Sequence, residues 1–162
     1  MMAAKRIPWL HVIAGCMSSG KTAEVVRLLT RRQIAGQSVL LITPARDTRV
    51  APGEVVSRTG TRFPSVVAAD TAGILAEVAR RDPDAVAIEE AQFFGPDLPE
   101  VLEQILATPR TVIVSGLDQD FAGRDRNGFD RGGGARYPHQ LHRLPPKPKP
   151  LTQLARTVVI AF

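Results

Sequence analysis

The sequence has almost no cysteine and no long apolar run. Its 162 residues include a single cysteine, Cys16, which excludes an intrachain disulfide and a zinc site built from several cysteines. No apolar run approaches the roughly 20 residues that a membrane-spanning helix needs. The apolar stretch at residues 12–14 is too short for a secretory signal and runs directly into a glycine loop. We therefore expect no zinc site, no membrane partner and a cytoplasmic location.

A net positive charge is also lacking outside the last quarter of the chain. The formal net charge is +5, but residues 122–162 hold eight Lys or Arg residues and two Asp residues, which leaves −1 for residues 1–121. The basic character therefore belongs to the tail and says little about the partners of the remaining chain. The tail is rich in Gly and Arg at residues 122–137 and holds only Pro and Lys at residues 145–150, so we expect it to be poorly packed.

Short apolar runs alternate with helical periodicity through residues 1–121. The runs predict strands at residues 7–14, 38–43, 66–67, 85–88 and 111–115, and the periodic segments predict helices at residues 21–35, 71–81 and 99–107. Gly36, Asp70 and Pro99 lie where helix-terminal residues belong. Residues 44–65 are polar and long for a plain connection, which favours a functional segment. The alternation predicts an α/β domain with a mostly parallel sheet and helices on both faces.

Residues 15–22 match the phosphate-loop pattern of two glycines followed by Lys and Thr. A predicted strand precedes the loop and a predicted helix follows it, so its backbone N–H groups and the helix N-terminus can surround phosphate oxygens. We expect Lys21 to reach the β- and γ-phosphates of ATP and the Thr22 hydroxyl to bind Mg²⁺. The other expected ATP-binding residues of the loop are Gly15, Cys16, Met17, Ser18, Ser19 and Gly20. The alternative is a chance glycine-rich turn.

Two carboxylates, Glu89 and Glu90, end the apolar strand predicted at residues 85–88. In phosphate-loop enzymes such a strand lies beside the loop and its acid coordinates Mg²⁺, usually through water. Glu89 is the candidate for that role. Because the strand ends there, Glu90 is also expected to enter the site, where a second carboxylate would act as a general base. The alternative is a pair of solvated acids in a loop.

Four segments, in order and spacing, resemble the thymidine kinases of the cellular and bacterial type. They are residues 15–22, Pro-Ala-Arg-Asp-Thr-Arg at 44–49, Glu-Glu-Ala-Gln-Phe-Phe at 89–94, and Gly-Leu-Asp-Gln-Asp-Phe at 116–121. The resemblance covers residues 9–121. It implies a P-loop NTPase-like kinase domain at residues 1–121 that transfers the γ-phosphoryl group of ATP to the 5′-hydroxyl of thymidine. It also implies a homo-tetramer.

The resemblance also assigns roles to individual residues. Glu90 would be the general base. Glu89 would hold Mg²⁺ with Thr22, and the cofactor site would also include Ala91, Gln92 and Arg49. The thymidine site would include Met17, Asp47, Phe93, Leu117 and Phe121. The ordinary alternatives are a core position for Leu117, a turn for Asp47 and a backbone cap for Gln92.

The sequence departs from this family in two places. Glu89 stands where the family has Asp, which lengthens the side chain by one methylene. After Phe121 the family has Pro-Phe-Gly and a zinc-bearing subdomain whose loop closes over thymidine, whereas this chain has Ala-Gly-Arg-Asp-Arg-Asn-Gly. We therefore expect impaired kinase activity. The alternative function is a P-loop ATP-binding protein or ATPase without kinase activity. For the tail we consider an out-of-frame reading, a basic segment that binds nucleic acid, or a solvated linker, and we do not expect nucleic acid as a partner.

Overall fold

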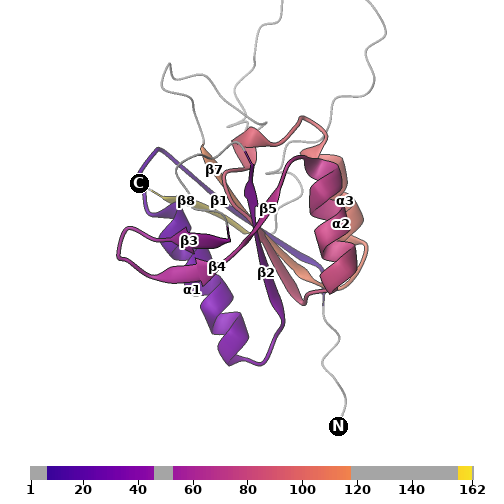
Figure 1. Ribbon diagram of the computed structural model, residues 1–162, viewed down its shortest axis with the longest axis horizontal. Coiled ribbons are helices and arrows are strands. Elements are labelled where there is room, and N and C mark those ends of the chain that lie inside the picture. Colours follow the sequence, from indigo (N-terminus) through magenta and orange to yellow (C-terminus); the bar gives the residue numbers. More distant parts are fainter. Residues whose placement is uncertain (1–6, 46–52, 118–156, 162) are drawn as a thin grey trace, which may run out of the picture.

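A six-stranded sheet forms the centre of the protein and is covered by helices on both faces (Figure 1). The computed structural model describes residues 7–45, 53–117 and 157–161. The strands of this sheet are β1 (Trp9–Gly15), β2 (Val39–Pro44), β5 (Val66–Ala68), β6 (Ala85–Ile88), β7 (Thr111–Leu117) and β8 (Thr157–Ala161). The helices are α1 (Lys21–Ile34), α2 (Thr71–Arg81), α3 (Leu98–Leu106) and the short 3₁₀ helix η1 (Ala91–Phe93).

Every strand pair in this sheet is parallel, and the strand order is β5-β2-β6-β7-β1-β8. Parallel sheets are covered on both faces, and their strands are therefore apolar along their whole length. All four residues of β6 are buried, as this rule requires. The predicted α/β fold with a mostly parallel sheet and helices on both faces is confirmed.

Alternate residues of the central strands build two separate cores. Leu10 and Val12 of β1 pack with α2 and α3 on one face of the sheet, together with Val86 and Val112. Ile13 of β1 faces the other way and packs with Val25, Val26 and Leu29 of α1 and with Leu41, Ala87 and Ile113. This period of two follows from strand geometry, in which successive side chains point to opposite faces. The cores fix α1 on one face and α2 and α3 on the other (Figure 1).

The sequence predicted most of these elements within one or two residues. Asp70 caps α2 as expected, because its side chain accepts a hydrogen bond of 2.8 Å from the Gly73 amide. Gly36 adopts a positive φ of +76° after α1, as expected of a left-handed cap. Helix α3 begins at Leu98, with Pro99 in its first turn. Strand β7 runs to Leu117, two residues beyond the predicted end.

Two features were not predicted. The polar segment at residues 44–65 contains an antiparallel hairpin, β3 (Glu54–Val56) and β4 (Arg62–Pro64). Its inward residues Val55 and Phe63 are buried in the core on the α1 face. The second feature is β8, which pairs with β1 at the edge of the sheet. Residues 157–161 thus depart from the expected poorly packed tail, and residues 118–156 and 162 lie outside the described residues.

Candidate nucleotide-binding site

The predicted phosphate loop links the carboxyl end of β1 to the amino end of α1. Gly20 occupies the N-cap position of α1 with φ +87°, and Ser18 also has a positive φ, +66°. A positive φ suits glycine at no steric cost, whereas it strains a serine by on the order of 1 kcal/mol. The first amides of α1 have no partner within the helix, so they form a cluster of donors at the helix N-terminus.

Lys21 folds back over this loop. Its side chain is only 7% exposed, and its ammonium group donates a hydrogen bond of 2.7 Å to the carbonyl oxygen of Cys16. The Cys16 residue itself is exposed. Lys21 therefore places a positive charge against the loop backbone and lines the cavity described below.

Glu89 lies at the end of β6 and is almost completely buried, with 4% of its surface exposed. Each of its carboxylate oxygens accepts a hydrogen bond from a hydroxyl group. Thr22 Oγ1 donates to Oε2 at 2.9 Å, and Ser115 Oγ donates to Oε1 at 2.8 Å. Burial raises the pKa of the Glu89 carboxyl, while the two hydroxyl donors and Lys21 act to lower it and Glu90 acts to raise it. Although β7 separates β6 from β1 in the sheet, the Glu89 side chain still reaches the phosphate loop.

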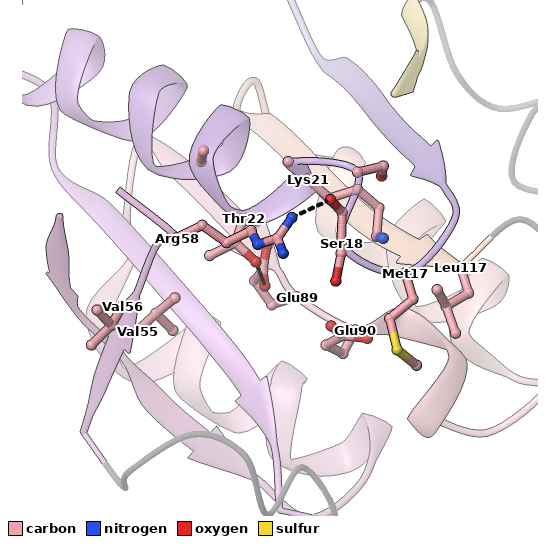
Figure 2. Close-up of a pocket in the computed structure, with 13 residues that line it drawn as sticks. Met17, Ser18, Lys21, Thr22, Val55, Val56, Arg58, Glu89, Glu90 and Leu117 are labelled. Carbon is pink, nitrogen blue, oxygen red and sulfur yellow. Dashed lines mark hydrogen bonds between the residues drawn. The ribbon is translucent and has the colours of Figure 1, made fainter. Parts of the chain in front are cut away.

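Glu90 follows directly and points into a different part of the site. Its backbone is left-handed, with φ 51° and ψ 50°, which is unusual for a residue with a side chain. The side-chain Nε2 of Gln92 donates to the Glu90 carboxylate, and its side-chain Oε1 accepts from the backbone amide of Leu117 at 3.2 Å. Gln92 thus links Glu90 to the end of β7. Figure 2 shows Glu90 on the side of Met17 and Leu117, away from Thr22.

These side chains surround a cavity of about 300 Å³ (Figure 2). Residues 17–23 form the wall on the loop side, Glu89, Glu90 and Leu117 line it from the ends of β6 and β7, and Val55, Val56 and Arg58 line it from the hairpin. The structure therefore brings together most of the loop, both carboxylates and Leu117, as the sequence predicted for the ends of parallel strands.

Other predicted site residues lie outside the lining. Gly15 and Cys16 are not among the residues that line the cavity, and Ala91 is buried in the core at 1% exposure. Gln92 bonds Glu90 and the backbone amide of Leu117, and its predicted role in the ATP site stays a prediction. Phe93 is 37% exposed in η1. Asp47, Arg49 and Phe121 lie outside the described residues, so their roles stay predictions.

Besides Ala23, which directly follows the predicted loop, sequence reasoning missed four residues of this site. Val55, Val56 and Arg58 belong to the hairpin, whose strands have only three residues each. The turn-forming sequence Ser-Arg-Thr-Gly at 57–60 was the signal that could have placed a hairpin there. The fourth is Ser115, which ends the apolar strand predicted at residues 111–115 with a buried hydroxyl group. A buried polar group requires a partner, and here the partner is Glu89.

The Thr22 hydroxyl and the Glu89 carboxylate are suitable ligands for Mg²⁺. Both are hard oxygen donors, they lie 2.9 Å apart, and Mg²⁺ commonly takes one or two protein oxygens and completes its octahedron with water and phosphate. Among the residues that the structure describes, no group of three or more His, Cys, Asp or Glu side chains could hold a metal ion. The expected absence of zinc stays a prediction. In the same described part of the chain, none of the helices has the length and apolar character needed to cross a membrane.

Comparison with known proteins agrees with the motifs. The family model described as thymidine kinase matches residues 8–130, about three quarters of the sequence. This chain belongs to the thymidine kinase family. The family match extends nine residues beyond the last motif at residue 121.

Several curated members of the family are similar to this chain. A thymidine kinase from Coprothermobacter proteolyticus is 45% identical over 115 residues, covering 71% of this chain and 57% of the relative. A thymidine kinase from Mesoplasma florum is 36% identical and covers 78% of this chain and 64% of the relative. One from Halobacterium salinarum is 39% identical and covers 76% of this chain and 64% of the relative. The chain thus spans about three fifths of the length of these relatives.

A solved structure supports the fold. The flagellar accessory protein FlaH from Methanocaldococcus jannaschii superimposes with a TM-score of 0.50, covering 72% of this chain and 66% of that chain. The sequence identity is 13%, so the likeness concerns the arrangement of strands and helices alone.

Proposed function

We propose that this member of the thymidine kinase family transfers the γ-phosphoryl group of ATP to the 5′-hydroxyl of thymidine. Membership of the family supports the reaction. The single observation that carries the mechanism is the contrast between two neighbouring carboxylates in one cavity. Glu89 is buried and accepts a hydrogen bond from Thr22 of the phosphate loop. Glu90 instead lines the part of the cavity next to Met17 and Leu117 (Figure 2).

The loop side of the cavity would bind the triphosphate. The backbone amides of residues 15–22 would cradle the phosphates, and Lys21 would exchange the Cys16 carbonyl for a β- or γ-phosphate oxygen. Thr22 and Glu89 would hold Mg²⁺, which when bound would supply positive charge against the negative charge of the phosphates. The Ser115 hydroxyl keeps the Glu89 carboxylate oriented toward Thr22.

The part of the cavity next to Glu90, Met17 and Leu117 would bind the nucleoside. The Glu90 carboxylate would accept the proton of the 5′-hydroxyl as the hydroxyl oxygen bonds to the γ-phosphorus and the bond to the ADP oxygen breaks. Gln92 would position Glu90 through the hydrogen bond between them. Met17 is 65% exposed, and an exposed thioether beside the proposed base suits contact with a nucleobase. The proposed nucleoside site also includes Phe93 and Leu117, together with Asp47 and Phe121, which lie outside the described residues. The proposed ATP site also includes Ala91 and Arg49.

Phosphoryl transfer from γ-labelled ATP, with thymidine, deoxycytidine and water as competing acceptors, tests this function. We expect labelled thymidine monophosphate as the product, at a reduced turnover because the residues after Phe121 differ from those of the family lid. ATP binding without transfer to thymidine would contradict the proposal and favour an ATP-binding protein or ATPase. The cytoplasmic location, the homo-tetramer and the absence of a nucleic-acid partner stay predictions.

A further inference from the structure

Arg58 lies at the turn of the β3–β4 hairpin, and the hairpin holds it in a defined place. The Ser57 amide donates to the Thr61 carbonyl at 2.8 Å, and the Gly60 amide donates to the Ser57 carbonyl at 2.9 Å. Val55 and Phe63, on the two strands of the hairpin, are 2% and 6% exposed and pack on the α1 face of the sheet. The buried side chains of the hairpin therefore anchor the turn that carries Arg58.

From this turn, Arg58 reaches the phosphate loop. Its Nη1 group donates a hydrogen bond of 2.9 Å to the carbonyl oxygen of Ser18, forty residues earlier in the chain (Figure 2). Arg58 lines the same cavity as Lys21. The two cations are held in the same manner, because each donates to a neutral carbonyl of the loop, at Ser18 and at Cys16.

A phosphate would be a stronger acceptor than either carbonyl. Hydrogen bonds between a guanidinium group and a phosphate are charge-assisted and about twice as strong as neutral ones, and the planar guanidinium matches two phosphate oxygens at once. Without Arg58, the charged residues lining the cavity would be Lys21, Glu89 and Glu90, with a formal sum of −1. That sum would oppose the entry of a polyanion. Arg58 brings the sum to zero before any metal binds.

We propose that Arg58 is a phosphate-binding residue that contacts the terminal phosphate of the bound nucleoside triphosphate from the hairpin side. This inference rests on the ATP site of the proposed function. The γ-phosphate is favoured because Arg58 lines the cavity together with Thr22 and Glu89, the residues that would hold Mg²⁺ and its charge near the transferred phosphoryl group. Arg58 is distinct from Arg49, to which the family resemblance assigns a cofactor role.

Calorimetric titration of the full chain with ATP, ADP and AMP, each with Mg²⁺, tests this role without any acceptor. We expect Arg58→Gln to weaken ATP binding by about tenfold and ADP binding by less than about threefold, since only ATP carries the terminal phosphate. Arg58→Lys should retain part of the ATP affinity, because it keeps the charge and loses the planar pair of donors. The matched control is Arg62→Gln on the same hairpin, where Arg62 pairs with Glu54 at 2.8 Å and does not line the cavity. It should bind both nucleotides within about twofold of the wild type.

Three results would overturn the inference. One is an Arg58→Gln variant that binds ATP as tightly as the wild type. Another is an equal loss for ATP and ADP in a variant of unchanged thermal stability, which would mean that Arg58 only positions Ser18. The third is a wild-type chain that binds no ATP. A wild type that binds ATP and fails to phosphorylate thymidine refutes the proposed kinase, and in that case the ATP-to-ADP comparison still decides the role of Arg58.

Discussion

Ser115→Ala is expected to destabilise the protein by about 2 kcal/mol, because it removes a hydrogen bond from a buried charge. Ser115 is 1% exposed and donates at 2.8 Å to Oε1 of Glu89, which is itself 4% exposed. Thr22 is bonded to the other oxygen, so it cannot replace the lost donor without leaving Oε2. Hydrogen bonds to charged groups contribute about 1.5–3 kcal/mol, and a buried acceptor left without a donor retains its desolvation cost. For a chain of this length, 2 kcal/mol corresponds to a fall in Tm of about 4–8 °C.

Urea unfolding and thermal melts of matched variants measure this effect. Ser65→Ala is the control, because the Ser65 hydroxyl is buried without a hydrogen-bond partner in the described part of the chain. Its removal breaks no hydrogen bond and leaves no other group unpaired, so it should not destabilise the protein. Ser115→Cys separates the hydrogen bond from the volume, since cysteine fills the space but donates weakly. A Ser115→Ala protein as stable as the Ser65→Ala control would refute the reasoning. So would full recovery in Ser115→Cys, because the effect would then come from packing.

Two further predictions concern stability away from the cavity. Asp70→Ala should cost about 1 kcal/mol in the free energy of unfolding, because the Gly73 amide loses the carboxylate that caps α2, and Asp70→Asn should restore most of it; equal losses in both variants would contradict this account. Burial lowers the pKa of His11, with Arg32 and Arg27 acting in the same direction and Glu24 against it. The unfolded chain therefore binds a proton first as the pH falls through about 6.5, and stability is lost from that point down toward the lower pKa of the folded state. His11→Gln should reduce the loss of unfolding free energy between pH 7.5 and 5.5, and an unchanged loss would show that other groups cause it.

Local sequence patterns were sufficient wherever the structure follows local rules. The buried strand at residues 85–88, the cap at Asp70 and the loop at residues 15–22 are each determined by neighbouring residues, and all three lie where they were predicted. The juxtaposition of Glu89 with Thr22 was also predictable, because parallel strands of an α/β sheet end at one edge.

The features that were missed depend on contacts between distant residues. The three-residue strands of the hairpin are too short for a period of two to be recognised, and Val55 is buried only because α1 and the sheet lie against it. The Arg58 contact with Ser18 spans forty residues and has no local signature. Strand β8 follows a Pro and Lys segment whose composition favours an extended tail, and its pairing with β1 is visible only in three dimensions.

Glu89 is proposed to hold Mg²⁺ and Glu90 to act as the general base. Transfer of the γ-phosphoryl group by Glu90→Gln tests this difference most directly. Glutamine keeps the size of the side chain and cannot accept the hydroxyl proton. We expect transfer to thymidine to fall by at least about 100-fold, with the Kd for ATP within about twofold of the wild type. The exposed Glu100→Gln on α3 is the matched control and should behave as the wild type. A Glu90→Gln protein that phosphorylates thymidine at the wild-type rate would contradict the account.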